Sequence, residues 1–553
     1  MAEQEISILI GGRAGDGISS AGQVVAHLLG HLGYTVYMYL DYPSRIKGGH
    51  NYAVVRAAGV PVGAVRNQVD CILALNQETI DRHRPRLSTQ GVILYNADSV
   101  SSPDGIGISV KAIRAEEQAP AVMGNSIFIG AFSKAAGISW EVTEQVLKKS
   151  IPKETEKNLR VARRAYDGSE KRMDVARLDR PVLPVFTGNE AIGLGLIEGG
   201  LQYYFGYPMS PTSNLLHFLA DNSEEARIRV IQPESEIAVL LMALGCAYAG
   251  KRAAVGTSGG GFCLMTEGLG LAGVAELPAL IILGQRTGPG TGLATYTAQA
   301  DLHFALNAGQ GEFPRLIVAP GDAEEAMSWS ATGMDLAWKY QIPAIILSDK
   351  IICEGVYSVD PEKILKKPRA QEPASVPSQP YYRYLITDTG ISPMRFPPVK
   401  GEIIRANSHV HEPDGITTEE PGITRAMADK RNRKMVFLRE EIEMMQPVNT
   451  GGKTDGPTAL LCWGSNKGIC NEIGSRMGLR VIQPVVLWPF PEKSLSRAME
   501  GVEQFFTVEL NETGQLGRLL REFGYHEQGT ILKYDGRPFT VEELEAEIRN
   551  VIA

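Results

Sequence analysis

The sequence lacks any close pair of cysteines. The two nearest, Cys462 and Cys470, are eight positions apart, and no Cys-x-x-Cys motif occurs. This spacing indicates neither a zinc knuckle nor an iron–sulfur cluster in this chain. Most of the cysteines lie in apolar runs, so we expect ordinary buried thiols. The full set is Cys71, Cys246, Cys263, Cys353, Cys462 and Cys470.

The sequence also lacks a hydrophobic run of the roughly 18 residues that a membrane-spanning helix needs. Asp and Glu outnumber Lys and Arg by 63 to 55, and the net charge of −8 gives no basic field for nucleic acid or an anionic membrane. The N-terminal MAEQEISILIGG has no basic stretch before its apolar residues, so no signal peptide is indicated. We expect a cytoplasmic protein that binds neither nucleic acid nor a membrane.

The 553 residues are too many for a single hydrophobic core, and they predict several domains. Strand-like apolar runs alternate with helical patterns along most of the chain, which predicts an α/β fold with mostly parallel sheets. Pro-rich and charged segments interrupt this alternation. We predict domains over 1–175, 187–370 and 455–553, with an extended segment over 371–454.

The stretch from 203 to 250 holds two strand–turn–helix units. An aromatic strand ends at Gly206, and the hydroxyl-rich residues 210–213 precede an apolar-periodic helix. A second short strand, RIRVIQP, is followed by Ser235 as a candidate cap and by Glu236 in the first turn of a helix. Parallel strands bring such residues to one ligand-binding edge. Alternatively, Glu236 complements the helix dipole and does nothing more.

A further strand, ALIILGQ, is followed at once by Arg286 and nine residues later by Thr295. A guanidinium binds a carboxylate through two parallel hydrogen bonds, and the hydroxyls of Ser210 and Thr295 can each donate one more. These residues also have plain structural interpretations, as an ion-pair member for Arg286, a turn hydroxyl for Ser210 and a loop residue for Thr295.

The N-terminal region begins with a strand over 6–12, a glycine-rich turn, a helix over 18–32 and a strand that ends at Asp41. This outline is typical of dinucleotide-binding folds, although the glycines at 12, 15 and 17 do not keep the GxGxxG spacing. The next loop places Ser44, Arg45 and Lys47 beside paired glycines, a combination that suits phosphate or a solvated turn. Further on we predict strands at CILALN, GVILYN and ISVKAI, and a charged helix from about 143 to 166.

Several of these motifs resemble those of the 2-oxoacid:ferredoxin oxidoreductases. Residues 207–213, YPMSPTS, are similar to the YPITP-type motif, with Ser210 where relatives usually have threonine. Residues 42–51 are similar to the PS-x-I-R-G-G-H-N loop of the γ domain, with Lys47 in place of arginine. LWPFP at 487–491 and E-x-N-x-x-G-Q at 509–515 are similar to the C-terminal domain shared with transketolases. The resemblance covers nearly the whole chain, in the order of forms whose γ part precedes the α part.

The resemblance implies three α/β domains: a γ-type domain, a pyrimidine-binding domain of thiamine enzymes and a transketolase C-terminal-like domain. It implies that Glu236 is the catalytic acid that addresses thiamine diphosphate. Ser210, Arg286 and Thr295 would bind the substrate carboxylate, and Ser44, Arg45 and Lys47 would hold coenzyme A. We assign no metal to this chain, because Gly15-Asp16-Gly17 imitates the start of a diphosphate–magnesium motif that lacks its later asparagines.

The resemblance further implies a β subunit that carries magnesium, the diphosphate site and a four-iron four-sulfur cluster, with ferredoxin as electron acceptor and a dimer of αβ pairs as the assembly. Residues 388–415 are similar to the 2-oxoglutarate branch of the family. As a hypothesis, this similarity places Arg395, His409 and His411 near the substrate tail or the partner chain. The expected reaction converts 2-oxoglutarate and coenzyme A to succinyl-CoA and carbon dioxide, and it is chemically reversible.

Three alternatives stay open. The same chemistry on pyruvate or a branched 2-oxoacid needs the same carboxylate-binding residues. A nucleotide-dependent dehydrogenase would depend on residues 11–41 alone. A non-catalytic scaffold subunit would leave Glu236 and Arg286 without a role in turnover.

Overall fold

The computed structural model describes residues 4–43, 49–102, 104–364 and 380–552. The chain forms two compact units. Unit 1 comprises Met1–Thr187, Glu354–Asp360 and Pro538–Ala553, and unit 2 comprises Gly188–Cys353 and Pro361–Arg537. The four-part division made from the sequence stays a prediction. No helix in the described ranges combines the length and the apolar character that a membrane crossing requires.

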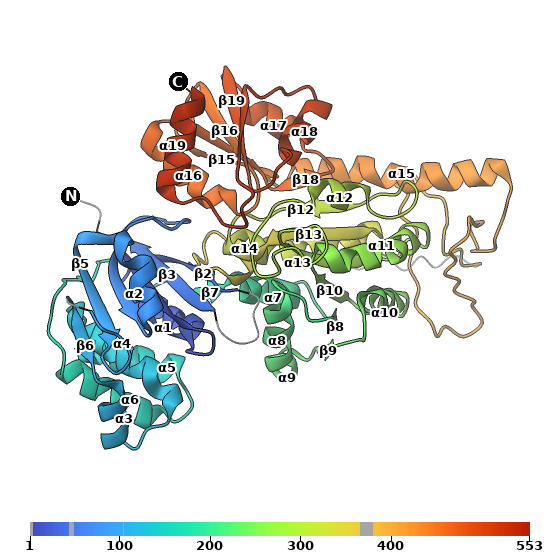
Figure 1. The fold of residues 1–553 in the computed structure, drawn as a ribbon. Helices are drawn as coiled ribbons and strands as arrows, with labels where there is room; N and C mark the ends of the chain where they lie inside the picture. The colour runs from blue at the N-terminus through green and yellow to red at the C-terminus, as the bar shows by residue number, and fades with distance from the viewer. Residues whose placement is uncertain (1–3, 44–48, 103, 365–379, 553) are drawn as a thin grey trace. The chain divides into compact units, whose positions relative to one another are not determined.

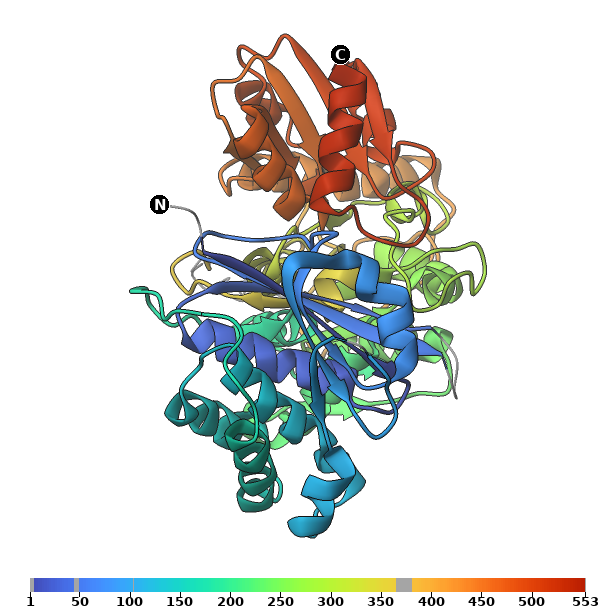
Figure 2. The ribbon, with the colours of Figure 1, turned by 60° about the vertical axis from the view of Figure 1, so that its left-hand side comes forward.

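Unit 1 is built on an eight-stranded sheet. In spatial order its strands are β6 (Ile106–Ile108), β5 (Leu87–Asn96), β4 (Val69–Ala74), β1 (Glu5–Arg13), β3 (His50–Ala58), β2 (Thr35–Asp41), β14 (Val356–Ser358) and β7 (Val185–Thr187). The pairings from β6 to β1 are parallel, and those from β1 to β7 are antiparallel. A layer of helices lies together on one side of the sheet (Figures 1 and 2), formed by α1 (Ile18–His31), α4 (Gly124–Ala135), α5 (Trp140–Ser150) and α6 (Thr155–Asp167).

Two predictions for unit 1 are wrong in detail. ISVKAI was predicted as a strand, but β6 ends at Ile108 and α3 (Val110–Glu116) begins two residues later. The single helix predicted from 143 to 166 is two helices, because α5 ends at Ser150 and Pro152 lies between it and α6. Proline lacks the N–H that a continuous helix requires.

The unit 1 topology also differs from the dinucleotide outline. The β3 strand lies between β1 and β2 and runs antiparallel to both, so β1, α1 and β2 do not form adjacent parallel strands. The Asp41 carboxylate at the end of β2 is buried and accepts a hydrogen bond from the Tyr39 hydroxyl at 3.2 Å. Asp41 is therefore engaged within the protein, where the dehydrogenase alternative needs it to face a ribose.

Unit 2 contains a seven-stranded sheet. In spatial order its strands are β18 (Val486–Trp488), β12 (Leu316–Val318), β13 (Pro343–Asp349), β11 (Ala279–Gln285), β10 (Ala253–Thr257), β8 (Tyr203–Gly206) and β9 (Arg229–Ile231). All neighbours are parallel except β18 and β12. The chain runs from β8 outward to β9 and then returns to β10 on the other side of β8. The strand order reverses there, which is where open α/β sheets bind ligands.

The helices of this sheet follow the apolar patterns of the sequence. The β11 and β13 strands are buried at every residue, as expected of parallel strands covered on both faces. The helices are α7 (Gly188–Glu198), α8 (Ser213–Asp221), α9 (Ser223–Ala226), α10 (Glu236–Tyr248), α11 (Gly259–Val274), α12 (Leu302–Asn307) and α13 (Ala323–Tyr340).

A five-stranded sheet completes unit 2. Its strands are β15 (Val448–Gly452), β17 (Arg480–Pro484), β16 (Thr458–Cys462), β19 (Gln504–Glu509) and β20 (Gly529–Leu532), with helices α16 (Asn466–Met477), α17 (Glu492–Ala498) and α18 (Gln515–Glu522). Gln299 joins this sheet to the loop after β11: its amide N–H donates to the Trp463 carbonyl at 2.7 Å, and its amide oxygen accepts from Asn466 Nδ2 at 2.9 Å.

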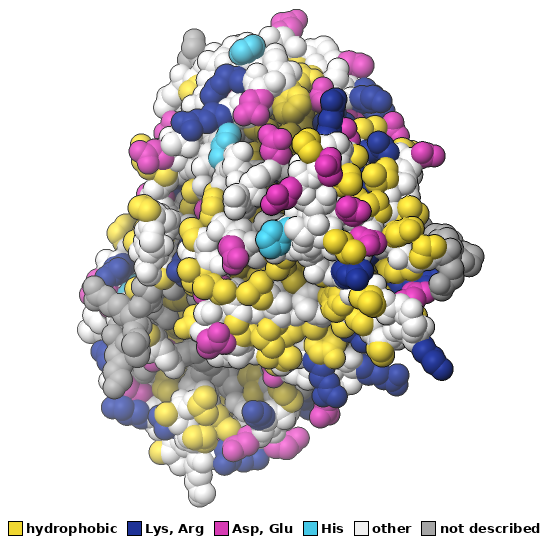
Figure 3. All heavy atoms as spheres, turned by 90° about the vertical axis from the view of Figure 1, so that its right-hand side faces the viewer, with side chains coloured by type: hydrophobic (Ala, Val, Ile, Leu, Met, Phe, Trp, Pro, Cys, Tyr) yellow, Lys and Arg dark blue, Asp and Glu magenta, His cyan; other side chains and the backbone are white. Residues whose placement is uncertain are grey.

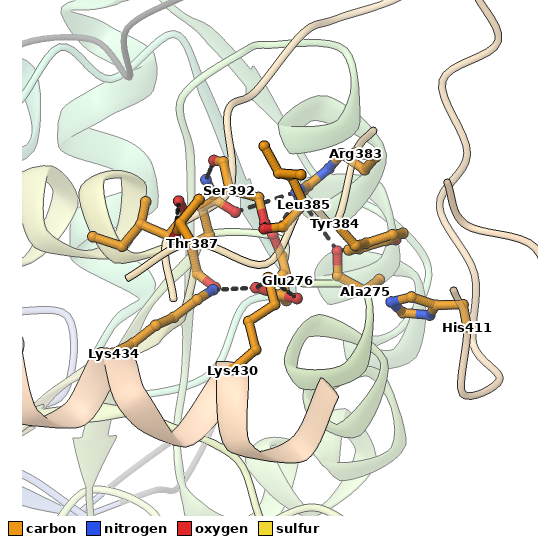
Figure 4. Close-up of polar contacts among 12 residues, drawn as sticks. Ala275, Glu276, Arg383, Tyr384, Leu385, Thr387, Ser392, His411, Lys430 and Lys434 are labelled. Atoms are coloured by element: carbon orange, nitrogen blue, oxygen red, sulfur yellow. Dashed lines mark hydrogen bonds and ion pairs between the residues drawn. The ribbon is translucent and has the colours of Figure 1, made fainter. Parts of the chain in front are cut away.

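The long helix α15 (Pro421–Glu443) closes over a buried charge cluster, Glu276 with Lys430 and Lys434 (Figure 4). Lys430 Nζ lies 2.6 and 2.7 Å from the two carboxylate oxygens of Glu276, and Lys434 Nζ also contacts this carboxylate. Arg383 donates to the Glu276 backbone carbonyl at 2.7 Å. These contacts fix the segment from 381 to 443 against the end of α11.

His411 belongs to the surroundings of this cluster. Its ring is buried and packs on Tyr384 at a centroid distance of 3.7 Å. Tyr384 in turn donates to the Ala275 carbonyl at 3.4 Å, and Arg395 pairs with Glu402. His411 therefore lies at the Glu276 end of α11, the opposite end from Glu236.

The predicted fold class is confirmed. The structure is α/β with three sheets, and most of the strand pairings are parallel. The antiparallel half of the unit 1 sheet is the main exception.

Candidate functional site

The candidate site lies in unit 2, at the carboxyl edge of its seven-stranded sheet. Residues 207–212 follow β8, Glu236 opens the helix after β9, and Ser258 follows β10. Arg286 follows β11 directly. The structure therefore brings these positions to the switch point between β8 and β10, as the parallel arrangement requires.

Glycines at the strand ends make room for the turn after β8. A Cβ on Gly284, in β11, would lie 2.8 Å from both Pro211 Cγ and Thr212 Cγ2. A Cβ on Gly256, in β10, would overlap the Tyr204 hydroxyl and approach Thr212. Thr212 is buried and its hydroxyl donates to the Met209 carbonyl at 3.0 Å. The turn is therefore packed directly on the sheet edge.

Glu236 is the first residue of α10 and is 3 % exposed. Ser235 occupies the N-cap position as predicted, but its side chain makes no capping hydrogen bond. The Glu236 carboxylate packs on the start of α11, where a Cβ on Gly261 would lie 2.6 Å from Oε1. Among the described residues, Glu236 Oε1 is buried without a hydrogen-bond partner. A buried carboxylate oxygen left in this state is costly, so it points to a ligand.

Arg286 and Ser210 meet, but not as the sequence suggested. Arg286 Nη1 donates to the backbone carbonyl of Ser210 at 3.3 Å. Burial lowers the pKa of Arg286, and the charges of Asp301 and Glu236 oppose that shift. Within the described part of the chain, Arg286 Nε is buried without a partner. The guanidinium is thus held on one side and keeps donors for an anion.

Thr295 is buried at 8 % exposure in the loop that leaves β11 at Arg286. This loop folds back on itself, since the Leu293 N–H donates to the Thr287 carbonyl at 3.0 Å and the Thr287 hydroxyl donates to the Thr297 carbonyl at 2.9 Å. The roles of Ser210, Glu236, Arg286 and Thr295 stay predictions.

Two residues that the sequence reasoning passed over support the site. Asn189, near the start of α7, is buried and donates from Nδ2 to the Pro211 carbonyl at 3.0 Å. Asp301, at the end of the loop after β11, lies against Gly259 at the start of α11. A carboxylate at the end of a long loop after a buried strand is the signal that could have identified Asp301.

The loop assigned to coenzyme A gives no further geometry. Ser44, Arg45 and Lys47 lie outside the described residues, and their role stays a prediction. Nearby, Asp16 Oδ2 accepts the Arg13 N–H at 2.7 Å, so Asp16 closes its own turn. His50, at the start of β3, is buried with its Nε2 2.8 Å from His83 Nε2. Burial and the neighbouring charges of His50, Arg86 and Arg82 lower the pKa of His83 to about 3, so His83 is neutral near pH 7.

The cysteines largely follow the sequence expectation. Cys71, Cys353, Cys462 and Cys470 are buried free thiols, Cys246 is half-buried and Cys263 is exposed on α11.

Two family models match the chain. Residues 194–429 match the model described as pyruvate flavodoxin/ferredoxin oxidoreductase, thiamine diphosphate-binding. Residues 7–168 match the model described as pyruvate ferredoxin/flavodoxin oxidoreductase. The first match contains Ser210, Glu236, Arg286, Thr295 and Asp301.

Relatives and a solved structure extend this likeness over the full chain. The chain is 30 % identical to the 2-oxoacid:ferredoxin oxidoreductase subunit alpha of Saccharolobus solfataricus, over 99 % of this chain and 98 % of the relative. It is 25 % identical to the 2-oxoglutarate oxidoreductase subunit KorA of Mycobacterium tuberculosis, over 100 % and 92 %. The structure of the 2-oxoglutarate:ferredoxin oxidoreductase from Magnetococcus marinus, with 2-oxoglutarate, coenzyme A and succinyl-CoA bound, matches with a TM-score of 0.88 and 26 % identity over the whole of both chains. This chain belongs to the alpha-subunit family of the thiamine diphosphate-dependent 2-oxoacid:ferredoxin oxidoreductases.

Proposed function

We propose that this chain is the γ-fused α subunit of a coenzyme A-acylating oxidoreductase that converts 2-oxoglutarate to succinyl-CoA and carbon dioxide, with electrons passing to ferredoxin. One observation carries the proposal. Glu236 and Arg286 stand at the switch point of the sheet, each with a buried polar atom that no described residue satisfies. The 2-oxoglutarate and succinyl-CoA named for the Magnetococcus marinus structure support the choice of substrate.

The residues present fit thiamine diphosphate. Glu236 offers a buried carboxylate oxygen without a partner, and Gly261 leaves the space beside it. When bound, the coenzyme supplies the carbon nucleophile and the electron sink for loss of the carboxylate. Glu236 would accept a hydrogen bond from the pyrimidine ring of the coenzyme and would favour the imino tautomer of that ring. This role requires a carboxylate and not merely a neutral hydrogen-bond acceptor.

Arg286 would bind the 2-oxoacid carboxylate. Its guanidinium is restrained by the Ser210 carbonyl and is half-buried, so a carboxylate placed on it is held in a poorly solvated site. The Ser210 and Thr295 hydroxyls would each add a hydrogen bond to the same substrate group. The same set accepts any 2-oxoacid, so pyruvate and branched 2-oxoacids are outcomes of the test below.

An apolar surface beside Glu236 supports a β subunit as partner. Hydrophobic side chains gather on the face shown in Figure 3. On α10 and α11 the exposed large ones are Ile237, Leu241, Met242 and Leu264, at 39–48 % exposure. Ile237 directly follows Glu236, so a subunit that covers these side chains also closes the site. That β subunit would carry magnesium, the diphosphate site and the four-iron four-sulfur cluster, in a dimer of αβ pairs.

The proposal is tested by co-expressing the chain with its β subunit and measuring reduction of a low-potential dye. We expect turnover that requires coenzyme A and favours 2-oxoglutarate over pyruvate. Arg286→Lys keeps the charge but loses the planar fork, so it should raise the KM for the 2-oxoacid about tenfold or more. Turnover on pyruvate alone would show that the chain acts on pyruvate, by the same family of reactions, and not on 2-oxoglutarate.

A matched control separates binding from folding. Arg252, in the same unit, forms an ion pair with Asp335, so Arg252→Lys changes an arginine outside the site. It should leave the KM unchanged. Full activity in both Glu236→Ala and Arg286→Ala would instead support the scaffold alternative.

A further inference from the structure

Asp301 occupies the N-cap position of α12 but does not cap that helix with its side chain. Its backbone is fixed from both sides, because its N–H donates to Gln285 Oε1 at 2.9 Å and its carbonyl accepts from the Ala305 N–H at 2.8 Å. An aspartate at an N-cap normally accepts a hydrogen bond from the first turn of its own helix. Here the carboxylate is directed elsewhere.

The Asp301 carboxylate packs on the start of α11. A Cβ on Gly259 would lie 2.7 Å from Asp301 Oδ2 and 2.9 Å from Oδ1. Two residues later, Gly261 faces the Glu236 carboxylate in the same way. Within the described part of the chain, Asp301 Oδ2, Glu236 Oε1 and Arg286 Nε are all buried without hydrogen-bond partners. Asp301 therefore belongs to the same unsatisfied group as the two predicted site residues.

Arg286 is the charge that acts on Asp301. Burial raises the pKa of Asp301 to about 6, and the Arg286 guanidinium works against this rise. Among the described residues, no ion pair within 4.0 Å joins the two side chains. The carboxylate is thus a loose counterion of Arg286. The pKa of Asp301 rises further if another anion binds the Arg286 guanidinium.

Other ionisable groups of this region are Glu236, His303, Lys350 and Arg537. Glu236, on α10, acts electrostatically on Arg286. His303, on α12 itself, is hydrogen-bonded to Gln515 through its backbone N–H at 3.1 Å and its ring Nε2 at 3.0 Å. Lys350 and Arg537 pack over the ring of Tyr296, in the loop that leads to Asp301.

We propose that Asp301 is a positioning residue of the 2-oxoacid site that acts through Arg286. In the free site its carboxylate neutralises the Arg286 guanidinium. When the substrate carboxylate binds this guanidinium, the Asp301 carboxylate takes up one proton from solvent. When carbon dioxide leaves, Arg286 loses the substrate carboxylate, and Asp301 returns the proton to solvent. This inference rests on the proposed function, because it requires a 2-oxoacid on Arg286.

The experiment uses the assembled complex with its β subunit. Binding of 2-oxoglutarate without coenzyme A or ferredoxin is followed by titration calorimetry in two buffers of different ionisation enthalpy, which counts the protons taken up. The wild type should take up a fraction of one proton at pH 7. Asp301→Asn should take up close to none, because the amide does not titrate.

Initial rates give a second readout. In the wild type the KM for 2-oxoglutarate should rise with pH above about 6, at a slope that approaches tenfold per pH unit, because the ionised carboxylate competes for Arg286. In Asp301→Asn the KM should be flat between pH 6 and 8.5 and lower than the wild-type value at pH 8.5. The kcat should change much less than the KM.

The outcomes separate the two proposals. If the wild-type complex turns over no 2-oxoacid, the proposed function fails. If the wild type is active and Asp301→Asn shows the same proton uptake and the same pH profile, the role of Asp301 is overturned. A loss of thermal stability with an unchanged pH profile also overturns it, since that result indicates a structural carboxylate. Asp301→Ala checks that the effect follows loss of the titrating group.

Discussion

The two ends of α11 hold buried carboxylates in opposite conditions. Just beyond the carboxyl end, Glu276 is 1 % exposed and is bound by Lys430 and Lys434. At the amino end, Glu236 and Asp301 each keep an oxygen that no described residue satisfies. The first group is complete within the chain and belongs to the fold. The second is incomplete within the chain, which is the condition expected of a ligand site.

Electrostatics shows the same contrast. Burial alone would raise the pKa of Glu276, but Lys434 and Lys430 hold it well below its ordinary range. Burial raises the pKa of Asp301 to about 6, and Arg286 only partly opposes the rise. A lowered carboxylate pKa stabilises the folded protein near neutral pH, whereas a raised one costs stability there. The buried carboxylate of the candidate site therefore lowers the free energy of unfolding near neutral pH, whereas the Glu276 cluster raises it.

The largest expected effect is on folding. Glu276→Gln leaves two buried lysines without their carboxylate, and breaking a buried pair in this way costs roughly 3–5 kcal/mol of the free energy of unfolding. Equilibrium urea unfolding of the isolated chain measures it. The triple variant Glu276→Gln, Lys430→Met, Lys434→Met should recover most of the loss. An unchanged single variant would break the comparison.

The matching change at the other end should affect activity instead. Glu236→Gln keeps the shape of the side chain but removes its charge, and turnover of the assembled complex should fall about 100-fold or more. The free energy of unfolding of the isolated chain should stay the same or rise, because an unsatisfied buried carboxylate is removed. A destabilised and fully active variant would show that Glu236 is structural.

A smaller effect separates two neighbouring glycines. Gly261→Ala places a Cβ 2.2 Å from Thr257 Oγ1 and 2.6 Å from Glu236 Oε1, so we expect about 1–3 kcal/mol of destabilisation and a loss of turnover from a displaced carboxylate. Gly260→Ala is the control, because its Cβ approaches nothing nearer than the Gly290 carbonyl at 3.8 Å. It should be neutral or slightly stabilising. Equal behaviour of the two variants would remove the steric argument.

The smallest effect is a pH slope. Burial, with the charges of Lys434 and Arg383, lowers the pKa of Lys430 to about 7, against the attraction of Glu276. Between pH 7 and the ordinary lysine pKa of 10.5 the unfolded chain therefore binds more protons at this position than the folded chain. The free energy of unfolding should rise with pH across that window, by at most roughly 1 kcal/mol per pH unit.

Lys430→Met tests this slope. Urea unfolding at a series of pH values should show a flatter curve for the variant than for the wild type. Parallel curves would mean that Lys430 titrates in the folded chain as it does in the unfolded one.

The candidate site was largely accessible from the sequence because its residues follow strands in short motifs. Glu236 and Arg286 each lie just after a recognisable strand, and parallel strands bring such positions to one edge. Asp301 was not identified, because it lies sixteen positions from the end of β11 and only the folded loop carries it to Gly259. The same holds for Asn189, whose partner is the Pro211 carbonyl.

The buried cluster at Glu276 was not predictable from pattern. Lys430 and Lys434 belong to a strongly charged helix, and this charge predicts that the helix is exposed to solvent. In the structure both lysines lie on its buried face, which they share with Met427, Leu438 and Ile442. Their spacing of four residues puts them on one side of α15, but nothing local indicates that this side is covered. The covering carboxylate is 154 positions away in the chain.

By itself the sequence determined the α/β class, the strand and helix alternation of unit 2 and the motifs that gather at its switch point, since these depend on short-range periodicity and on turn residues. The tertiary structure decided which buried charges are paired. It inserted β3 between β1 and β2, placed Glu276 between two lysines, and left Glu236, Arg286 and Asp301 with unsatisfied atoms. The physical reason is that the cost of a buried charge depends on neighbours that are distant in the chain, so its role is fixed only when the chain has folded.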